Sequence, residues 1–230
     1  MTAIAVVRSE HFIVIAADGA NVDAMRQKNS TGHKIRRIGR FFYAAHNLVR
    51  NTDLGYDLPK IIEDNSEHDS LESLALAIAV AAQGPLSRVL STLKLSFPGR
   101  FKEMFSTGQG AAIILAGSPR GRNHLSVLYL RLIIENPDDD NIEVKAAWKL
   151  CPGPECLPRC TVHPFIGPPD VKEKFDAKRP GWWLGPEKEV AKNAKALIQE
   201  LINLGTNDFG PPITVLILKQ HSFYWLESDD

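Results

Sequence analysis

The sequence has no excess of charge of either sign, few cysteines and no long hydrophobic run. Lys plus Arg and Asp plus Glu both number 27, so no overall field favours nucleic acid or an acidic membrane surface. The apolar runs are short and interrupted, well below the roughly 20 residues that a transmembrane helix needs. The first 30 residues lack the basic-then-apolar order of a signal peptide. We therefore expect a cytoplasmic protein that binds neither nucleic acid nor a membrane.

Several common functional motifs are also missing. The chain has no P-loop, no G-x-G-x-x-G behind a strand, no H-E-x-x-H and no G-x-S-x-G. The pair Gly108 and Gly110 precedes a strand with no helix behind it, which is a poor arrangement for binding phosphate. We expect no cofactor.

What is present is an ordinary globular composition with alternating blocks of strand and helix patterns. The chain has 230 residues, of which 44% are apolar and 23% charged, enough for one large domain with a substantial core. β-rich runs predict a hairpin near the N-terminus and a second pair of strands around Gly39. These runs cover residues 3–8, 12–17, 34–39 and 40–46.

The rest of the chain continues this order. Helical periodicity predicts a helix over 69–95, capped near Ser70 and kinked or split at Gly84 and Pro85, and an amphipathic helix over 187–203 that Gly205 stops. β-rich runs at 110–117, 124–134 and 141–150 and a closing hairpin within 212–227 predict further strands. The result is an α+β protein with mostly antiparallel sheets.

The N-terminus carries the candidate chemistry. An N-terminal threonine has a base of its own, the α-amino group, whose pKa lies near 7.7–8.0, and Thr2 would expose one if Met1 were removed. Asp18 lies in the segment IAADG, at the end of an apolar strand run, and Lys34 lies at the start of the next pair of strands. Counted from Thr2, Asp18 is the seventeenth residue and Lys34 the thirty-third. With these offsets the sequence resembles the proteasome β-subunits, which are N-terminal-nucleophile (Ntn) hydrolases, and most closely their HslV-type bacterial members.

The resemblance implies a four-layer αββα sandwich, with two antiparallel sheets between helix layers, formed by a single domain over 1–230. A loop rich in proline, cysteine and tryptophan would be inserted at about 151–186. Matching the family's order of elements also implies helices near 48–63 and 169–177. Family behaviour implies a homo-oligomer, often a ring, sometimes fed by an ATPase and acting on peptide or protein substrates.

In this interpretation Thr2 is the nucleophile. Lys34 would lower the pKa of the Thr2 amine by like-charge repulsion and stabilise negative charge on Oγ. Asp18 would hold Lys34 in place and charged. The structural alternative is a turn aspartate followed by glycine and a solvated lysine.

The sequence departs from the family in three places. Leu48 stands at the glycine whose backbone N–H forms the oxyanion hole, and the N–H survives only if the turn needs no positive φ there. His46 falls at the floor of the substrate pocket, where it could select acidic or polar side chains or close the pocket. Two serine-bearing motifs are replaced by proline-rich segments at Pro168 and around Gly210, which would leave Asp208 or Thr206 to substitute.

All three cysteines lie in CPGPECLPRCTVH, with a histidine just behind them. Three thiolates and an imidazole can hold zinc, but the spacing lacks paired C-x-x-C knuckles, so a disulfide or three reduced thiols are the alternatives. The candidate zinc ligands are Cys151, Cys156, Cys160 and His163. Downstream, Trp182 and Trp183 are expected to cover an exposed edge or a neighbouring subunit.

The sequence thus predicts a threonine-dependent amide-bond hydrolase that works through an acyl-enzyme. A non-catalytic assembly subunit of the same fold is the rival interpretation, and a small-molecule amidase is a third.

Overall fold

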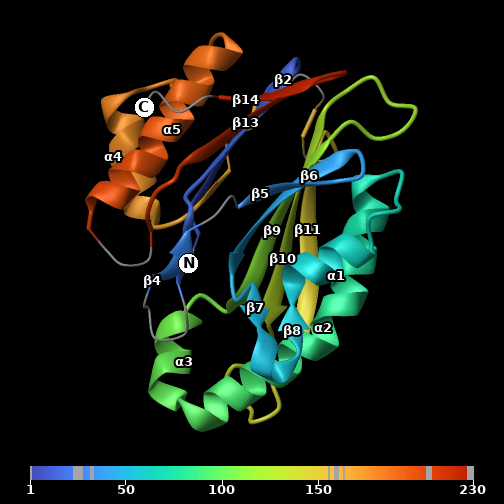
Figure 1. Cartoon of the computed structure of the whole chain (residues 1–230), viewed down its shortest axis with the longest axis vertical. Coiled ribbons are helices and arrows are strands. Elements are labelled where there is room, and N and C mark those ends of the chain that lie inside the picture. Colours follow the sequence, from blue (N-terminus) through green and yellow to red (C-terminus); the bar gives the residue numbers. More distant parts are fainter. Residues whose placement is uncertain are drawn as a thin grey trace.

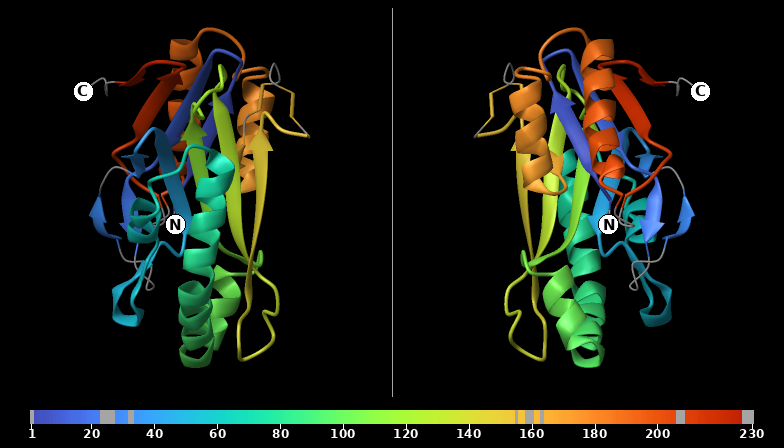
Figure 2. Two further views of the ribbon diagram at one scale, coloured as in Figure 1. Left: turned by 90° about the vertical axis from the view of Figure 1, so that its right-hand side faces the viewer. Right: turned by 90° about the vertical axis from the view of Figure 1, so that its left-hand side faces the viewer.

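The computed structural model describes residues 2–22, 28–31, 34–154, 156–157, 161–162, 164–205 and 209–226. Two five-stranded antiparallel sheets face each other, with helices on both outer faces (Figures 1 and 2). One sheet is covered by α4 and α5, and the other by α1 and α2. This is the predicted order of four layers, helix, sheet, sheet and helix.

The first sheet has the strand order β12-β1-β2-β13-β14. In β1 and β2 every residue is buried, because this sheet is covered on both faces. The predicted N-terminal hairpin and the closing hairpin both lie in this sheet. Its strands are β1 (Ile4–Arg8), β2 (Phe12–Ala17), β12 (Phe165–Ile166), β13 (Thr214–Lys219) and β14 (Phe223–Trp225).

The second sheet has the strand order β11-β10-β9-β6-β5. All its neighbours pair antiparallel, as the β-rich runs in the middle of the chain predicted. Its strands are β5 (Ile35–Ile38), β6 (Phe41–Asn47), β9 (Gln109–Gly117), β10 (Ser126–Ile134) and β11 (Val144–Cys151).

Alternation along the strands divides the apolar residues into separate layers. In β1, Ile4 and Val6 enter the core between the sheets, whereas Ala5 and Val7 pack toward α5. In β6, Phe42 and Ala44 also face the other sheet. The same alternation assigns Thr2 and His46 to the inner side of their sheets, which is the first reason why they meet.

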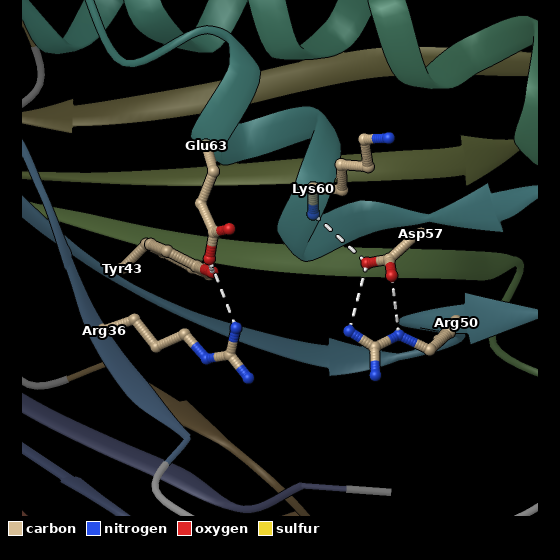
Figure 3. Close-up of polar contacts among 6 residues, drawn as sticks. All are labelled: Arg36, Tyr43, Arg50, Asp57, Lys60 and Glu63. Carbon is tan, nitrogen blue, oxygen red and sulfur yellow. Dashed lines mark hydrogen bonds and ion pairs between the residues drawn. The ribbon is translucent and has the colours of Figure 1, made fainter.

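The segment after β6 differs from the expected helix over 48–63. It forms β7 (Arg50–Asn51), a 3₁₀ turn (Thr52–Leu54) and β8 (Tyr56–Asp57) before α1 (Leu58–Asp64) begins. The helix starts late because the Asp57 carboxylate caps it, accepting a hydrogen bond of 3.1 Å from the Lys60 backbone N–H, while Pro59 occupies the first turn (Figure 3). Asp57 also pairs with Arg50 at 2.8 Å.

A polar contact fixes α1 to the second sheet. Glu63, on α1, accepts hydrogen bonds from the Tyr43 hydroxyl at 3.1 Å and from Arg36 at 3.2 Å, as Figure 3 shows. Burial raises the pKa of Tyr43 above its usual range, so the hydroxyl stays protonated and donates. The contact holds α1 against the strands that lead to Lys34 and His46.

Helix α2 (Leu71–Ser96) is continuous, so the predicted split at Gly84 and Pro85 was wrong. Pro85 removes one helical N–H and its hydrogen bond, at a cost of about 3 kcal/mol. Eight of the nine buried side chains of α2 belong to the core against the second sheet, and their burial offsets that cost. By length and hydropathy alone α2 is also long and apolar enough to cross a membrane, a test that buried core helices pass as well.

The remaining elements include some that the sequence did not indicate. The hairpin of β3 (Ala20–Val22) and β4 (Lys28–Thr31) follows β2, and α3 (Pro98–Met104) follows α2. Helices α4 (Pro169–Lys178) and α5 (Glu187–Asn203) match their predicted ranges closely.

Trp182 is a core residue rather than the cover of an exposed edge. Only 4% of it is exposed, its ring packs on Phe175 at 5.6 Å, and its indole N–H donates to Asp176 at 2.8 Å. Trp183 is half-buried beside it, with the two ring centres 5.9 Å apart. Trp182 therefore links α4 to α5, because the Asn193 side chain of α5 donates to its carbonyl at 3.2 Å.

Candidate functional site

The hydroxyl of Thr2 lies next to the ammonium of Lys34. Lys34 Nζ donates a hydrogen bond of 3.1 Å to Thr2 Oγ1. Thr2 enters the first sheet just before β1, and Lys34 stands just before β5 of the second sheet. The packing of the two sheets therefore brings together residues that are 32 positions apart.

Asp18 is fully buried at the end of β2, beside the start of β1. Its Oδ1 accepts the Ala3 backbone N–H at 2.7 Å, and its Oδ2 accepts the Gly210 N–H at 3.3 Å. Asp18 thus fixes the backbone that carries Thr2 and places a negative charge near Lys34.

The segment from Gly210 to Pro212 supports Asp18 in a way that the sequence did not indicate. The Gly19 N–H donates to the Gly210 carbonyl at 2.8 Å. A Cβ built on Gly19 would come within 2.5 Å of the Pro212 Cδ and 2.6 Å of its carbonyl oxygen. Only glycine fits at this close approach. The one signal in the sequence was the glycine directly behind Asp18.

Burial and two nearby charges shift the pKa of Lys34. Burial lowers the pKa of Lys34, and the positive charge of Arg36 lowers it further, while the negative charge of Asp18 raises it. Burial is the largest of these effects, so the net direction is downward. A lysine shifted in this way gives up its proton more easily than a surface lysine.

His46 contacts the backbone of Thr2. Its Nδ1 lies 3.4 Å from the Thr2 nitrogen and is in close contact with the Thr2 carbonyl oxygen. Burial lowers the pKa of His46 to about 4; the hydrogen bond with the Thr2 backbone opposes this shift, and the positive charge of Lys34 adds to it. A neutral imidazole attracts an acidic substrate side chain less than a charged one does, and the role of His46 in substrate selection stays a prediction.

The N–H of Leu48, expected to bind an oxyanion, has a backbone partner. It donates to the Gly110 carbonyl at 3.2 Å, where the ladder between β6 and β9 ends. The positive φ of this turn, 65°, falls on Asn47, which tolerates that conformation better than a leucine would. An oxyanion at this position would have to compete with the Gly110 carbonyl for the Leu48 N–H.

The other sequence-derived candidates are less well placed. Thr206 and Asp208 lie outside the described residues, and so do Cys160 and His163. Pro168 stands at the N-terminus of α4 and provides no hydroxyl. Their proposed contributions stay predictions.

Two of the four candidate zinc ligands are joined to each other. Cys151 and Cys156 form a disulfide, so they do not supply two thiolates. Of the three alternatives for this segment (a zinc site, a disulfide or three reduced thiols), the structure contains the disulfide. Among the described residues there is no group of three or more His, Cys, Asp or Glu side chains that could hold a metal ion.

The arrangement can support one kind of chemistry. A hydroxyl, an ammonium that can stabilise charge on it and a buried carboxylate lie at the N-terminal end of the chain, with a neutral imidazole against the same residue. These are the parts needed to activate a threonine nucleophile, provided that a base accepts the hydroxyl proton.

No protein-family model matches the chain, and no curated protein matches its sequence. Solved structures do match. A mutant Anbu from Hyphomicrobium sp. strain MC1 has a TM-score of 0.57 and 13% identity, covering 100% of this chain and 89% of its own. Anbu from Yersinia bercovieri, described as an ancestral beta-subunit, has a TM-score of 0.58 and 11% identity, covering 100% and 88%. At these identities the likeness concerns the fold.

The comparisons correct the assignment to the HslV-like branch. The similar structures are Anbu proteins, which form a different branch of proteasome-β-subunit-like proteins, so that assignment was wrong. The broader expectation is confirmed: the chain has the αββα, Ntn-type fold of a proteasome-like β-subunit.

Proposed function

We propose that this protein is a threonine-dependent amide-bond hydrolase that becomes active when Met1 is removed. The observation that carries the proposal is the hydrogen bond of 3.1 Å from Lys34 Nζ to Thr2 Oγ1, on an Ntn-type fold with Asp18 buried beside it. In the chain that retains Met1 the Thr2 nitrogen is an amide and cannot act as a base. Removal of Met1 would turn it into the amine that the reaction needs.

The reaction has two halves. In the first, Thr2 Oγ attacks the carbonyl carbon of a peptide bond, its proton passes to the Thr2 amine, and the same proton is delivered to the departing amine. An ester between Thr2 and the acyl part of the substrate results. In the second half a water molecule attacks the ester, the Thr2 amine takes its proton, and Thr2 Oγ recovers one. Lys34 stabilises the negative charge that develops on Oγ.

The test uses the purified full chain. Intact-mass measurement first establishes whether Met1 has been removed, and the protein is then treated with a peptide epoxyketone, which reacts with both the hydroxyl and the amine of an N-terminal threonine. The expected result is loss of the Met1 mass and one adduct on the peptide that begins with Thr2. A Thr2→Ala variant is the matched control and should give no adduct.

Two results would contradict the proposal. One is a processed protein, with Thr2 at its N-terminus, that gives no adduct. The other is an adduct that forms equally on the Thr2→Ala variant. If Met1 is retained, an N-terminal fusion cut to leave Thr2 first supplies the free amine, and the same test then applies.

A second candidate function, a non-catalytic assembly subunit, rests on the Leu48 turn. Since the Leu48 N–H is bonded to Gly110, the predicted oxyanion donor is occupied. In this alternative a chain with a free Thr2 amine would give no adduct yet would still assemble.

We also propose that the protein forms a homo-oligomer. The support is the fold of its neighbours, one of which is described as a beta-subunit. Light scattering of the purified chain measures this property independently of activity, and a monomer would contradict it. Ring geometry and an ATPase partner stay predictions from the sequence.

A further inference from the structure

A concave site lies at the opposite end of the sheets from Thr2. Three turns line an open pocket of about 230 Å³: the β5–β6 turn, the segment after β9 and the β13–β14 turn. In Figure 1 these turns gather at the upper right, whereas the N-terminus lies at the lower end of β1. The strand register agrees, because β13 meets the end of β2 near Asp18 at Thr214 and reaches this pocket at Lys219. The pocket is therefore separate from the candidate hydrolase site.

Two arginines supply the charge of the pocket. Arg37 and Arg40 line it together with His221, and none of the lining residues is acidic. This contrasts with the chain as a whole, in which acidic and basic residues are equal in number. Such a concentration of cations in a concave site raises the local concentration of anions.

One of these cations is held in position. The Arg37 guanidinium donates through Nε to the Gly39 carbonyl at 3.0 Å and lies 5.2 Å from the centre of the Phe223 ring. The Lys219 ammonium, by contrast, pairs with Glu187 of α5 at 2.6 Å, and this pair offsets its charge. Side chains that are already ordered lose less entropy when a ligand binds.

The neutral part of the pocket suits a small ligand with a charged group. Phe42 and Leu125 are buried and form apolar lining, while Ser118 and Ser222 contribute hydroxyl groups. Guanidinium forks and hydroxyls together supply more donors than a carboxylate accepts, and they match the three free oxygens of a phosphate group.

We propose that this pocket binds a phosphate-bearing small molecule. The probe is pyrophosphate, titrated calorimetrically into the full-length protein at low ionic strength, with malonate as the carboxylate comparison. One pyrophosphate binds per chain, and malonate binds more weakly. The double variant Arg40→Gln/His221→Gln, at two exposed turn positions, weakens pyrophosphate binding about tenfold or more.

Two controls establish that pyrophosphate binds in this pocket and not elsewhere on the protein. Arg50→Gln removes one positive charge from a surface outside the pocket and leaves the affinity unchanged. Thr2→Ala, which removes the candidate nucleophile, also leaves it unchanged, so the outcome is independent of the hydrolase proposal. The proposal is overturned if pyrophosphate gives no binding heat, if malonate binds equally well, or if Arg50→Gln weakens binding as much as the double variant.

Discussion

The Lys34 ammonium is the only positive charge that the described contacts bring to the Thr2 hydroxyl. We expect Lys34→Met, which keeps the length of the side chain and removes the charge, to slow adduct formation on Thr2 about 100-fold or more. The rate is measured by mass spectrometry against time, with processed protein. The matched control is Lys60→Met on α1, whose exposed position leads us to expect the wild-type rate. Equal rates for wild type and Lys34→Met would exclude Lys34 from the chemistry.

His46 makes the stability of the fold depend on pH. Because its pKa is about 4 in the folded chain and 6.5 in the unfolded reference, both states are neutral above pH 6.5. As pH falls from 6.5 to 4, the unfolded state takes up the proton first, so the free energy of unfolding decreases by about 3 kcal/mol. Urea unfolding across this range should show the decrease in wild type and a shallower one in His46→Asn. Identical pH profiles for wild type and His46→Asn would contradict the assignment of this pH dependence to His46.

At the residue scale, the sequence predicted which residues meet but not all of their contacts. The pairing of Thr2 with Lys34 followed from the resemblance that their offsets along the chain support, and the two side chains are in contact. The contact between His46 and the Thr2 backbone depends on how the two sheets pack, which no local pattern encodes. The partner of the Leu48 N–H depends on where the ladder between β6 and β9 ends, which is a matter of tertiary register.

Among the elements, the end of β2 and the segment around Gly210 act as one unit. Gly19→Ala would press a methyl group into Pro212, at distances that real Cβ atoms do not reach. We expect a loss of about 1–3 kcal/mol in the free energy of unfolding, and slower adduct formation because the Gly210 N–H is displaced from Asp18. Urea unfolding and the adduct rate are measured on the same preparation.

The matched control for this substitution is Gly99→Ala, at an exposed position in the first turn of α3. A Cβ built there meets no neighbouring atom within 4 Å. Alanine is more stable than glycine in a helix, so we expect a gain of about 0.5–1 kcal/mol and an unchanged adduct rate. A destabilised Gly99→Ala, or a Gly19→Ala variant as stable as wild type, would contradict this account of the two sites.

Elements defined by local pattern were easier to predict than those inferred from resemblance. The hairpin of β1 and β2 and helix α5 follow from alternation and amphipathic periodicity. The helix expected over 48–63 came from matching the family's order of elements, whereas the local signal, Asp57 followed by Leu58 and Pro59, indicates a later start. Pro85 was read as a break, but burial of one face of α2 outweighs a single missing hydrogen bond.

For the whole molecule, the core between the sheets links the two halves of the fold. It contains residues from both sheets, such as Ile15 of β2 and Ile114 of β9, both fully buried. Each sheet also has its own helix-side core, so each half could in principle hold together separately. Whether 1–230 behaves as a single domain depends on which of these contacts dominates.

We expect the shared core to dominate, so that the chain unfolds in one transition. Ile114→Ala, in the second sheet, should cost about 2–5 kcal/mol through lost burial and the cavity that it leaves. In a Trp148→Phe/Trp225→Phe background the fluorescence comes from Trp182 and Trp183, which lie in the opposite helix layer. Under single-domain behaviour Ile114→Ala shifts the urea midpoints of this fluorescence and of far-ultraviolet circular dichroism equally. If the fluorescence midpoint stays in place while the dichroism midpoint moves, the α4–α5 layer with its sheet is a separate unit, because the damage to the second sheet has not reached it.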